Sequence, residues 1–164
     1  MPTDTAITIR PANLASERDR SALVSLLDEY CKDVMGGGSP LPKNARMHLC
    51  DALAERSNAF VFLAFADESP AGIAICFEGF STFACKPLMN LHDFAVHPRF
   101  RGQGIAHRLL LAVEELARGR GCCKLTLEVL EGNQRAQKVY REFGFAGYEL
   151  DPKMGRALFF DKKL

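Results

Sequence analysis

The chain has 164 residues, which suits one domain with its own hydrophobic core. Hydrophobic residues make up 48% and charged residues 25%, a balance that excludes disordered and collagen-like classes. Lysine and arginine number 21 against 20 aspartates and glutamates, so the overall charge gives no reason to expect nucleic acid or an anionic membrane as a partner. We therefore expect a single globular domain over residues 1–164.

The cysteines and the first residues bear on metal binding and location. None of the six cysteines shows C-x-x-C spacing, so free thiols and no metal site are expected. The amino terminus lacks the charged and apolar regions of a secretory signal, and no apolar run approaches the roughly 18 residues of a membrane span. These features favour a cytoplasmic protein.

The first third of the chain predicts a strand and two helices. Residues 6–11 form the expected strand, and Ser16 is a suitable start for a helix that ends near Met35. Apolar side chains recur there at i, i+3, i+4 and i+7, at Leu23, Leu26, Leu27 and Tyr30. A glycine- and proline-rich loop at 36–42 separates this helix from a second over 44–56. The shared apolar face of the first helix is expected to be core.

The middle of the chain predicts a hairpin followed by a β-α-β unit. Apolar runs at 58–66 and 73–77 flank turn residues, and a further strand follows at 88–96. Pro98 ends that strand because proline cannot donate to a sheet. A helix over 104–119 then leads to an alternating strand at 125–129.

The last part of the chain predicts a helix and two short strands. Asn133 is a good helix N-cap, and Gly144 lies where that helix ends. Residues 145–148 and 157–160 are expected to be the last strands. The predicted order is βααβββαβαββ.

The turn between the strand at 88–96 and the next helix is rich in glycine and arginine. Its amides are unpaired and point outward at the positive end of the helix dipole, as in an anion site. Gly102 and Gly104 let a pyrophosphate approach the backbone, and Arg99, Arg101 and His107 add positive or donor character. The loop therefore predicts a phosphate-bearing ligand.

Two other interpretations of this turn exist. It could be a tight connection without a ligand, or a dinucleotide fingerprint with an acidic ribose ligand near Glu128. The dinucleotide interpretation is weaker, because His107 occupies the third glycine position and five residues, 97–101, separate the strand from the first glycine. It also requires a larger doubly wound sheet.

The stretch from Leu88 to Phe145 resembles the GNAT superfamily of acetyltransferases. It carries the R/Q-x-x-G-x-G/A loop at Arg99–Gly104, an asparagine that opens the next helix, and Tyr140 followed by a Gly-Phe pair. The resemblance implies an α/β (α+β) fold with a mixed, mostly antiparallel sheet of six to seven strands and about four helices. It also implies an acetyl-CoA-dependent N-acetyltransferase. Ala106 stands where the superfamily more often has glycine, a change that still permits close packing.

The resemblance also assigns the cofactor site. Backbone amides of residues 101–106 would hold the pyrophosphate, and the strand edge at 94–96 would pair with the pantetheine arm. The strands at 88–96 and 123–129 would splay apart, often at a bulge, to admit the thioester. The expected cofactor-binding residues are Phe94, Ala95, Val96, Arg101, Gly102, Gln103, Gly104, Ile105, Ala106, His107, Asn133 and Tyr140.

Acyl transfer to an amine requires an acid, an oxyanion donor and a base. The resemblance makes Tyr140 the acid for the departing thiolate, since a tyrosine pKa of about 10 keeps it protonated at neutral pH. It makes a backbone amide near Phe94 or Ala95 the oxyanion donor. For the base we favour His92 over Asp93, expected on the opposite face of the strand, and Glu128, expected on the next strand.

The acceptor side of the reaction is the least defined by sequence. The loops at 36–44 and 80–87 are expected to border a primary amine of a small molecule or peptide, but their composition selects no substrate. A non-catalytic acyl-CoA-binding sensor is the alternative function. The resemblance also makes a homodimer through the carboxy-terminal strands possible.

Overall fold

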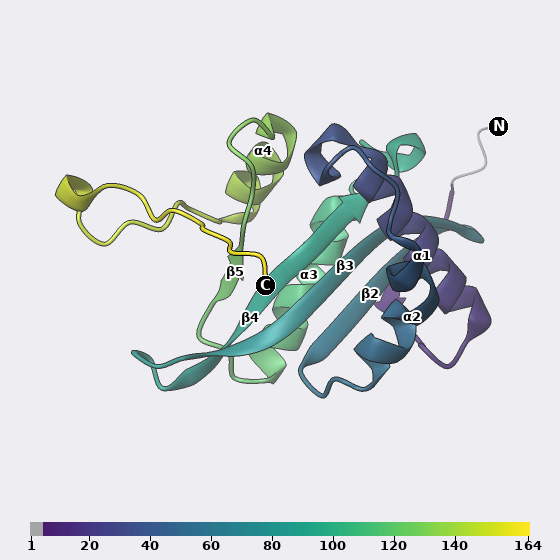
Figure 1. Cartoon of the computed structure of the whole chain (residues 1–164), viewed down its shortest axis with the longest axis horizontal. Coiled ribbons are helices and arrows are strands. Elements are labelled where there is room, and N and C mark those ends of the chain that lie inside the picture. The colour runs from purple at the N-terminus through teal and green to yellow at the C-terminus, as the bar shows by residue number, and fades with distance from the viewer. Residues whose placement is uncertain (1–4) are drawn as a thin grey trace.

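The computed structural model describes residues 5–164 and contains one sheet flanked by helices (Figure 1). The strands are β1 (Ile7–Pro11), β2 (Ala59–Ala66), β3 (Ser69–Ser81), β4 (Lys86–Val96) and β5 (Leu125–Leu127). The helices are α1 (Glu17–Lys32), α2 (Lys43–Ala54), α3 (Ile105–Gly119) and α4 (Gln134–Phe143). Short 3-10 turns lie at η1 (Val34–Gly36), η2 (Pro98–Phe100) and η3 (Pro152–Met154).

The sheet has the strand order β1-β2-β3-β4-β5. The first three pairings are antiparallel, and β4 pairs with β5 in parallel through the crossover helix α3. The predicted mixed, mostly antiparallel sheet and the β-α-β unit are therefore confirmed. Alternation along each strand sends successive side chains to opposite faces of this sheet.

Helices cover both faces of the sheet (Figure 1). On one face Leu23 and Leu26 of α1 pack with Ile73 and Ile75 of β3. On the other face the apolar side of α3, with Leu109 and Val113 fully buried, packs with β2, β3 and β4. Burial of these two layers is the main stabilising contribution to the fold.

Two carboxylates of α1 are buried and fix the helix by ion pairs. Asp19, 1% exposed, accepts hydrogen bonds from both terminal nitrogens of Arg10 and from the Asn13 amide. Asp28 accepts from the Leu41 amide and from Arg46, and also pairs with Lys32. The second set ties α1 to the end of the loop before α2 and to α2 itself.

The expected strands at 145–148 and 157–160 are wrong, and in residues 5–164 the sheet has five strands rather than six or seven. A strand needs a neighbour for its backbone hydrogen bonds. Here only one long bond links the two segments, from the Ala157 amide to the Tyr148 carbonyl at 3.5 Å. Between them η3 and the left-handed Gly155 turn the chain away from the sheet.

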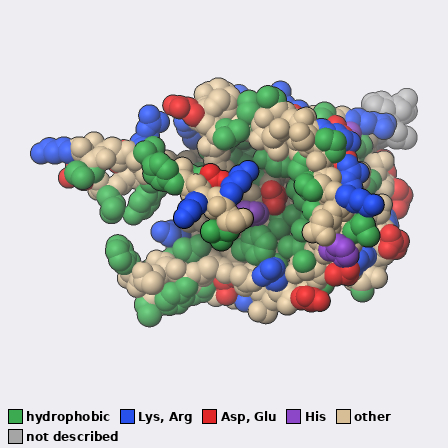
Figure 2. Space-filling view, viewed as in Figure 1, with side chains coloured by type: hydrophobic (Ala, Val, Ile, Leu, Met, Phe, Trp, Pro, Cys, Tyr) green, Lys and Arg blue, Asp and Glu red, His purple; other side chains and the backbone are tan. Residues whose placement is uncertain are grey.

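Apolar side chains gather on two projections at the same side of the molecule (Figure 2). One is the tip of the β3–β4 hairpin, with Phe80 and Phe83 exposed. The other is the carboxy-terminal segment 145–164, which exposes Leu158, Phe159 and Phe160. Among the described residues no helix combines the length and apolarity that crossing a membrane requires.

Candidate active site

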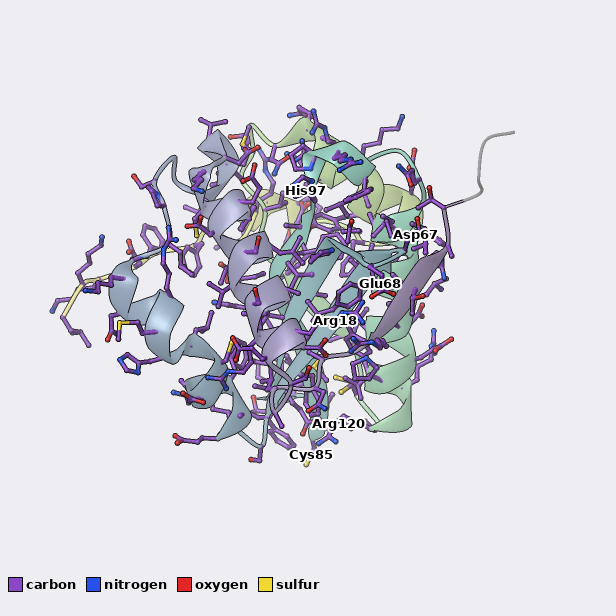
Figure 3. The ribbon with its side chains drawn as sticks, turned by 90° about the vertical axis from the view of Figure 1, so that its right-hand side faces the viewer. Arg18, Asp67, Glu68, Cys85, His97 and Arg120 are labelled. Carbon is purple, nitrogen blue, oxygen red and sulfur yellow. The ribbon has the colours of Figure 1, made fainter. Side chains whose placement is uncertain are left out.

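The sheet opens where β4 leaves β5. The two strands pair from Met89–Leu91 to Leu125–Leu127, and beyond Leu91 the edge of β4 has no neighbouring strand among residues 5–164. The free edge runs toward η2 and the start of α3. His97, just after β4, lies at the opposite end of the sheet from Cys85 at the hairpin tip (Figure 3).

A β-bulge lies at the point of divergence. Ile75 of β3 pairs with Asp93, but the next residue, Cys76, pairs with Leu91, which leaves His92 as the extra residue. The His92 ring stands edge-on to Phe77, with the ring centroids 5.3 Å apart, and both Phe77 and Ile75 belong to the layer beneath α1. The bulge therefore brings His92 and Asp93 to the same face, and the expectation that they lie on opposite faces is wrong.

Peptide groups of β4 alternate between its neighbour β3 and the open edge. The His97 amide donates to the Ala71 carbonyl of β3 at 2.9 Å, so the Ala95 peptide faces β3 as well. The peptide groups of Phe94 and Val96 then face the open edge, and the Val96 carbonyl accepts from Arg101 Nε at 3.2 Å. Of the two expected oxyanion donors, the alternation favours the Phe94 amide.

The glycine loop lies at the end of this edge. Gly102 and Gly104 are left-handed, with φ of 78° and 75°, and a Cβ at either would meet no protein atom within 4 Å. The first bond of α3 runs from the Arg108 amide to the Gly104 carbonyl, and amides from Gly102 to His107 have no acceptor in the described chain. These unpaired amides border open space, as an anion cradle requires.

Tyr140 of α4 lies beside the free edge. Its side chain is 8% exposed and packs against the rings of Phe94 and Phe145, with centroids 5.9 Å and 5.8 Å away. Burial, with a smaller effect from the Tyr30 phenol, raises the pKa of Tyr140 to about 12. The hydroxyl is thus protonated at neutral pH and can donate a hydrogen bond or a proton.

The other expected cofactor residues occupy the ends of α3 and α4. Asn133 caps α4 by accepting from the Ala136 amide at 3.1 Å, so only its side-chain nitrogen is free for a ligand. His107 lies exposed in the first turn of α3, with its ring 5.3 Å from that of Phe143. Ile105 is buried and anchors the loop, while Gln103 is exposed.

A cavity of about 150 Å³ lies between the last turns of α1 and the end of β4. Tyr30 lines it from α1, Ala95 and Val96 line it from β4, and Arg101 borders it beside the glycine loop. From the sequence we assigned Tyr30 only to a core face. The signal that could have identified it as a cavity residue is its position at the end of an amphipathic helix, just before a glycine-rich loop.

The Asp93 side chain also faces α1. It lies on the same side of β4 as the side chain of Ala95, which is two residues further along the strand. Burial raises the pKa of its carboxyl, an effect that His92 partly opposes. The pKa values of Tyr30 and Cys31 are raised mainly by burial and then by the Asp93 charge, which places all three groups close together. In residues 5–164 no group of three or more His, Cys, Asp and Glu side chains is arranged to hold a metal.

Solved structures share this arrangement. The aminoglycoside acetyltransferase AAC(6')-Iy in complex with a bisubstrate analog, CoA-S-monomethyl-acetylneamine, superimposes with a TM-score of 0.77 over 98% of this chain and 100% of its own, at 22% identity. At that identity the likeness shows the fold alone.

Sequence comparison defines the family. Residues 22–145 match the acetyltransferase (GNAT) family, and the chain belongs to that family. A thialysine N-epsilon-acetyltransferase of Caenorhabditis elegans is 35% identical over 79 residues, 48% of this chain and 49% of the relative. A [ribosomal protein bS18]-alanine N-acetyltransferase of Haemophilus ducreyi is 41% identical over 64 residues, 37% and 44% of the two chains. The chain thus spans about half the length, or less, of these relatives.

Proposed function

We propose that this protein transfers an acetyl group from acetyl-CoA to a primary amine of a small molecule or peptide, by direct attack in a ternary complex. Membership of the GNAT family supports the reaction class. The observation that carries the proposal is the free edge of β4, which begins at the bulge, passes Tyr140 and ends at the unpaired amides of the glycine loop. We further propose that residues 1–164 act as one domain in the cytoplasm.

The backbone can hold the cofactor along this path. Amides between Arg101 and His107 would bind the pyrophosphate, and the outward peptide groups of Phe94 and Val96 would pair with the amide-rich arm as an added strand does. The side-chain nitrogen of Asn133 would reach the arm from α4. The cavity beside Arg101 adjoins this path on the α1 side.

The acid role of Tyr140 is consistent with its surroundings. An ordinary thiol has a pKa of about 8.5 and an ordinary tyrosine about 10. Burial raises the pKa of Cys76, a thiol in the same apolar layer as Tyr140, to about 12, which equals the value for Tyr140. A thiolate expelled beside Tyr140 would also be poorly solvated, so its basicity would rise in the same direction as the pKa of Tyr140, a condition that favours proton transfer from the phenol.

We retain His92 as a residue that moves a proton between the site and solvent, since it is exposed and lies beside the bulge. His92→Ala should then change the pH-rate profile for amine acetylation. An unaltered profile would remove His92 from the proton path.

Acetyl-CoA titration and thiol release test the function together. We expect calorimetry to detect acetyl-CoA binding, and at least one amine in a panel of alkylamines, amino acids and peptides to release free coenzyme A. If acetyl-CoA binds but no amine in the panel releases coenzyme A, the sensor alternative is favoured. Absence of binding would overturn the proposal.

The exposed apolar segment 145–164 supports a further proposal about assembly. Apolar side chains exposed this far from the core are common at interfaces between chains. We propose that this segment packs against a second copy to form a homodimer. Sedimentation should show a dimer that becomes a monomer when residues 146–164 are removed; a monomeric full chain would contradict the proposal.

A further inference from the structure

A pair of polar side chains links β4 to β5 on the α1 side of the sheet. Asn90 Nδ2 donates to the Thr126 hydroxyl oxygen at 3.0 Å and lies 3.4 Å from the Thr126 carbonyl oxygen. Asn90 is also the register partner of Phe77, which belongs to the layer beneath α1. The pair therefore faces the α1 side, whereas Leu125 and Leu127 pack in the layer beneath α3.

The bonds within the Asn90–Thr126 pair leave one acceptor and one donor free. Both Thr126 oxygens face the amide nitrogen of Asn90, so the other amide atom, Oδ1, is directed away from Thr126. In residues 5–164 Oδ1 accepts no hydrogen bond and the Thr126 hydroxyl donates none, although a hydroxyl carries one proton to donate. No described side-chain oxygen is both fully buried and without a hydrogen bond, so Oδ1 retains contact with solvent.

The Asn90–Thr126 pair lies on a part of this face that no helix covers. In Figure 1, which views the sheet from the α1 side, α1 and α2 lie over β2 and the adjoining strands, while β5 lies to one side of both. The same view in Figure 2 shows a hollow between these helices and the carboxy-terminal segment. That segment borders the β5 side, where Lys124 Nζ lies 5.8 Å from the centroid of the Tyr148 ring. A ligand in the hollow can therefore reach the pair.

The Asn90–Thr126 pair also lies at a defined distance from the reacting edge of β4. Asn90 and Phe94 are four positions apart, and the bulge at His92 takes up one of them. At roughly 3.3 Å per strand residue, the pair lies about 10 Å from the Phe94 peptide. The His92 and Phe77 rings, with centroids 5.3 Å apart, lie along this stretch. An acceptor whose amine meets the thioester near Phe94 would extend its far end over these rings toward the pair.

We propose that Asn90 and Thr126 bind the far end of the acceptor and select amines that carry a hydroxyl or carboxamide about five carbons from the nitrogen. This inference rests on the proposed acetyl transfer and deepens it by naming a second group that the site recognises. A hydroxyl or carboxamide both donates and accepts, so it can pair with Oδ1 and with the Thr126 hydroxyl at once. A carboxylate has no proton for Oδ1, and a methyl group pairs with neither.

Selectivity follows from the hydrogen bonds that a wrong acceptor leaves unmade. A site built to bind a polar group rejects an analogue that lacks it, because the polar groups of the site lose their contact with water and gain no partner. Both side chains here are half-buried, so water replaces part of the loss. The expected discrimination is therefore about tenfold, well below that of a closed site.

The Asn90–Thr126 bond also holds the short strand β5 against β4, and this structural role has a different signature. Loss of strand pairing would change the rates for all acceptors alike. Loss of recognition changes the ratio of kcat/KM between acceptors that differ only at the far end. The ratio is therefore the quantity to measure.

The test uses pairs of acceptors of equal size in full-length protein, assayed by release of coenzyme A. Hexylamine is compared with 5-aminopentanol, and 5-aminopentanoate with 5-aminopentanamide. Thr126→Val removes the hydroxyl and keeps the shape of the side chain, Thr126→Ser keeps the hydroxyl, and Asn90→Leu removes the amide. Thr8→Val, at an exposed position on β1 at the other edge of the sheet, is the matched control. Thermal melting measures folding, and calorimetry measures acetyl-CoA affinity.

We expect the wild type to prefer 5-aminopentanol to hexylamine by about tenfold or more in kcat/KM, and the amide to the acid. The preference should fall about threefold or more in Thr126→Val and disappear in Asn90→Leu. Thr126→Ser and Thr8→Val should keep it. Acetyl-CoA affinity should change by less than about twofold in every variant, because the cofactor is held by other groups.

Several outcomes would overturn the inference and leave acetyl transfer standing. They are equal kcat/KM within both pairs in the wild type, a preference for 5-aminopentanoate, and a full preference for 5-aminopentanol in Thr126→Val. Acetylation of other amines but of none of these four would have the same meaning. If Asn90→Leu fails to fold, Thr126→Val and the wild-type ratios decide the question. Absence of acetyl-CoA binding in the wild type would instead reject the proposed function.

Discussion

The two sides of the gap beside β4 use different parts of the polypeptide. On the cofactor side, the edge of β4 and the glycine loop present backbone groups, from the outward peptides of Phe94 and Val96 to the unpaired amides before α3. On the α1 side, the surface consists of side chains, among them Tyr30 and Asp93. Backbone recognition depends on conformation and therefore on glycine, whereas side-chain recognition can change with one substitution.

This difference separates what is common to a family from what is particular to one chain. A donor with pyrophosphate and amides is recognised by backbone geometry that many sequences can adopt. An acceptor is recognised by the charge and shape of a few side chains on separate elements. Changes on the cofactor side should therefore affect every acceptor alike, and changes on the α1 side should affect acceptors selectively.

The largest expected effect is on the cofactor side, at Tyr140. Tyr140→Phe keeps the contacts with Phe94 and Phe145 but removes the proton donor, so kcat should fall about 10²-fold or more for every acceptor. Steady-state kinetics with calorimetry would show acetyl-CoA affinity changed by no more than a few fold. Tyr148→Phe, at an exposed phenol, is the matched control. An unchanged kcat in Tyr140→Phe would exclude Tyr140 from the chemistry.

A second change tests the glycine loop. Gly104 is left-handed, where a β-branched residue is strained by roughly 1–2 kcal/mol, and a side chain there would also fill the open space of the cradle. We expect Gly104→Val to weaken acetyl-CoA binding about tenfold or more, as measured by calorimetry. Gly119→Val, at the other end of α3 and without a positive φ, should bind nearly as the wild type does. Equal affinities would mean that the loop does not hold the cofactor.

The sequence predicted the helices of the cofactor side well because their signals are local. The bounds of α3 and α4 follow from apolar periodicity, from the Asn133 cap and from Gly144, all within one helix length. The bulge at His92 could not be predicted, because it depends on how β4 pairs with β3. The same is true of the last two expected strands, since an aromatic run forms a strand only beside a partner. Tyr30 fitted a core pattern, and only the packing of α1 beside β4 shows that it also lines the cavity.

A smaller effect is expected on the α1 side, from a substitution at Asp28. Asp28→Asn weakens the ties to Arg46 and Lys32 and loosens the loop before α2, while the Asp93 surface stays intact. We expect KM for the amine to rise about threefold to tenfold with acetyl-CoA affinity unchanged, because loop displacement misplaces the acceptor. Arg118→Gln removes only the pair with Glu114 on the surface of α3 and should change KM less than about twofold. An equal loss of acetyl-CoA affinity in Asp28→Asn would mean that the two sides are not separate.

The smallest expected effect is on stability, and its sign distinguishes Asp93 from Asp19. Burial raises the pKa of Asp93 in the folded state, so its ionised form opposes folding, and this cost builds up as pH rises from the unfolded pKa of about 4 toward the raised pKa and is complete above it. Arg10 lowers the pKa of Asp19, so that carboxylate stabilises the fold above its unfolded pKa of about 4, and the stabilisation is lost as pH falls through the lowered pKa. Thermal melting at pH 7 should therefore show a higher Tm for Asp93→Asn and a lower Tm for Asp19→Asn, with the gain in Asp93→Asn vanishing in acid. A lower Tm for Asp93→Asn at pH 7 would mean that Asp93 stabilises the fold, contrary to the raised pKa of its carboxyl.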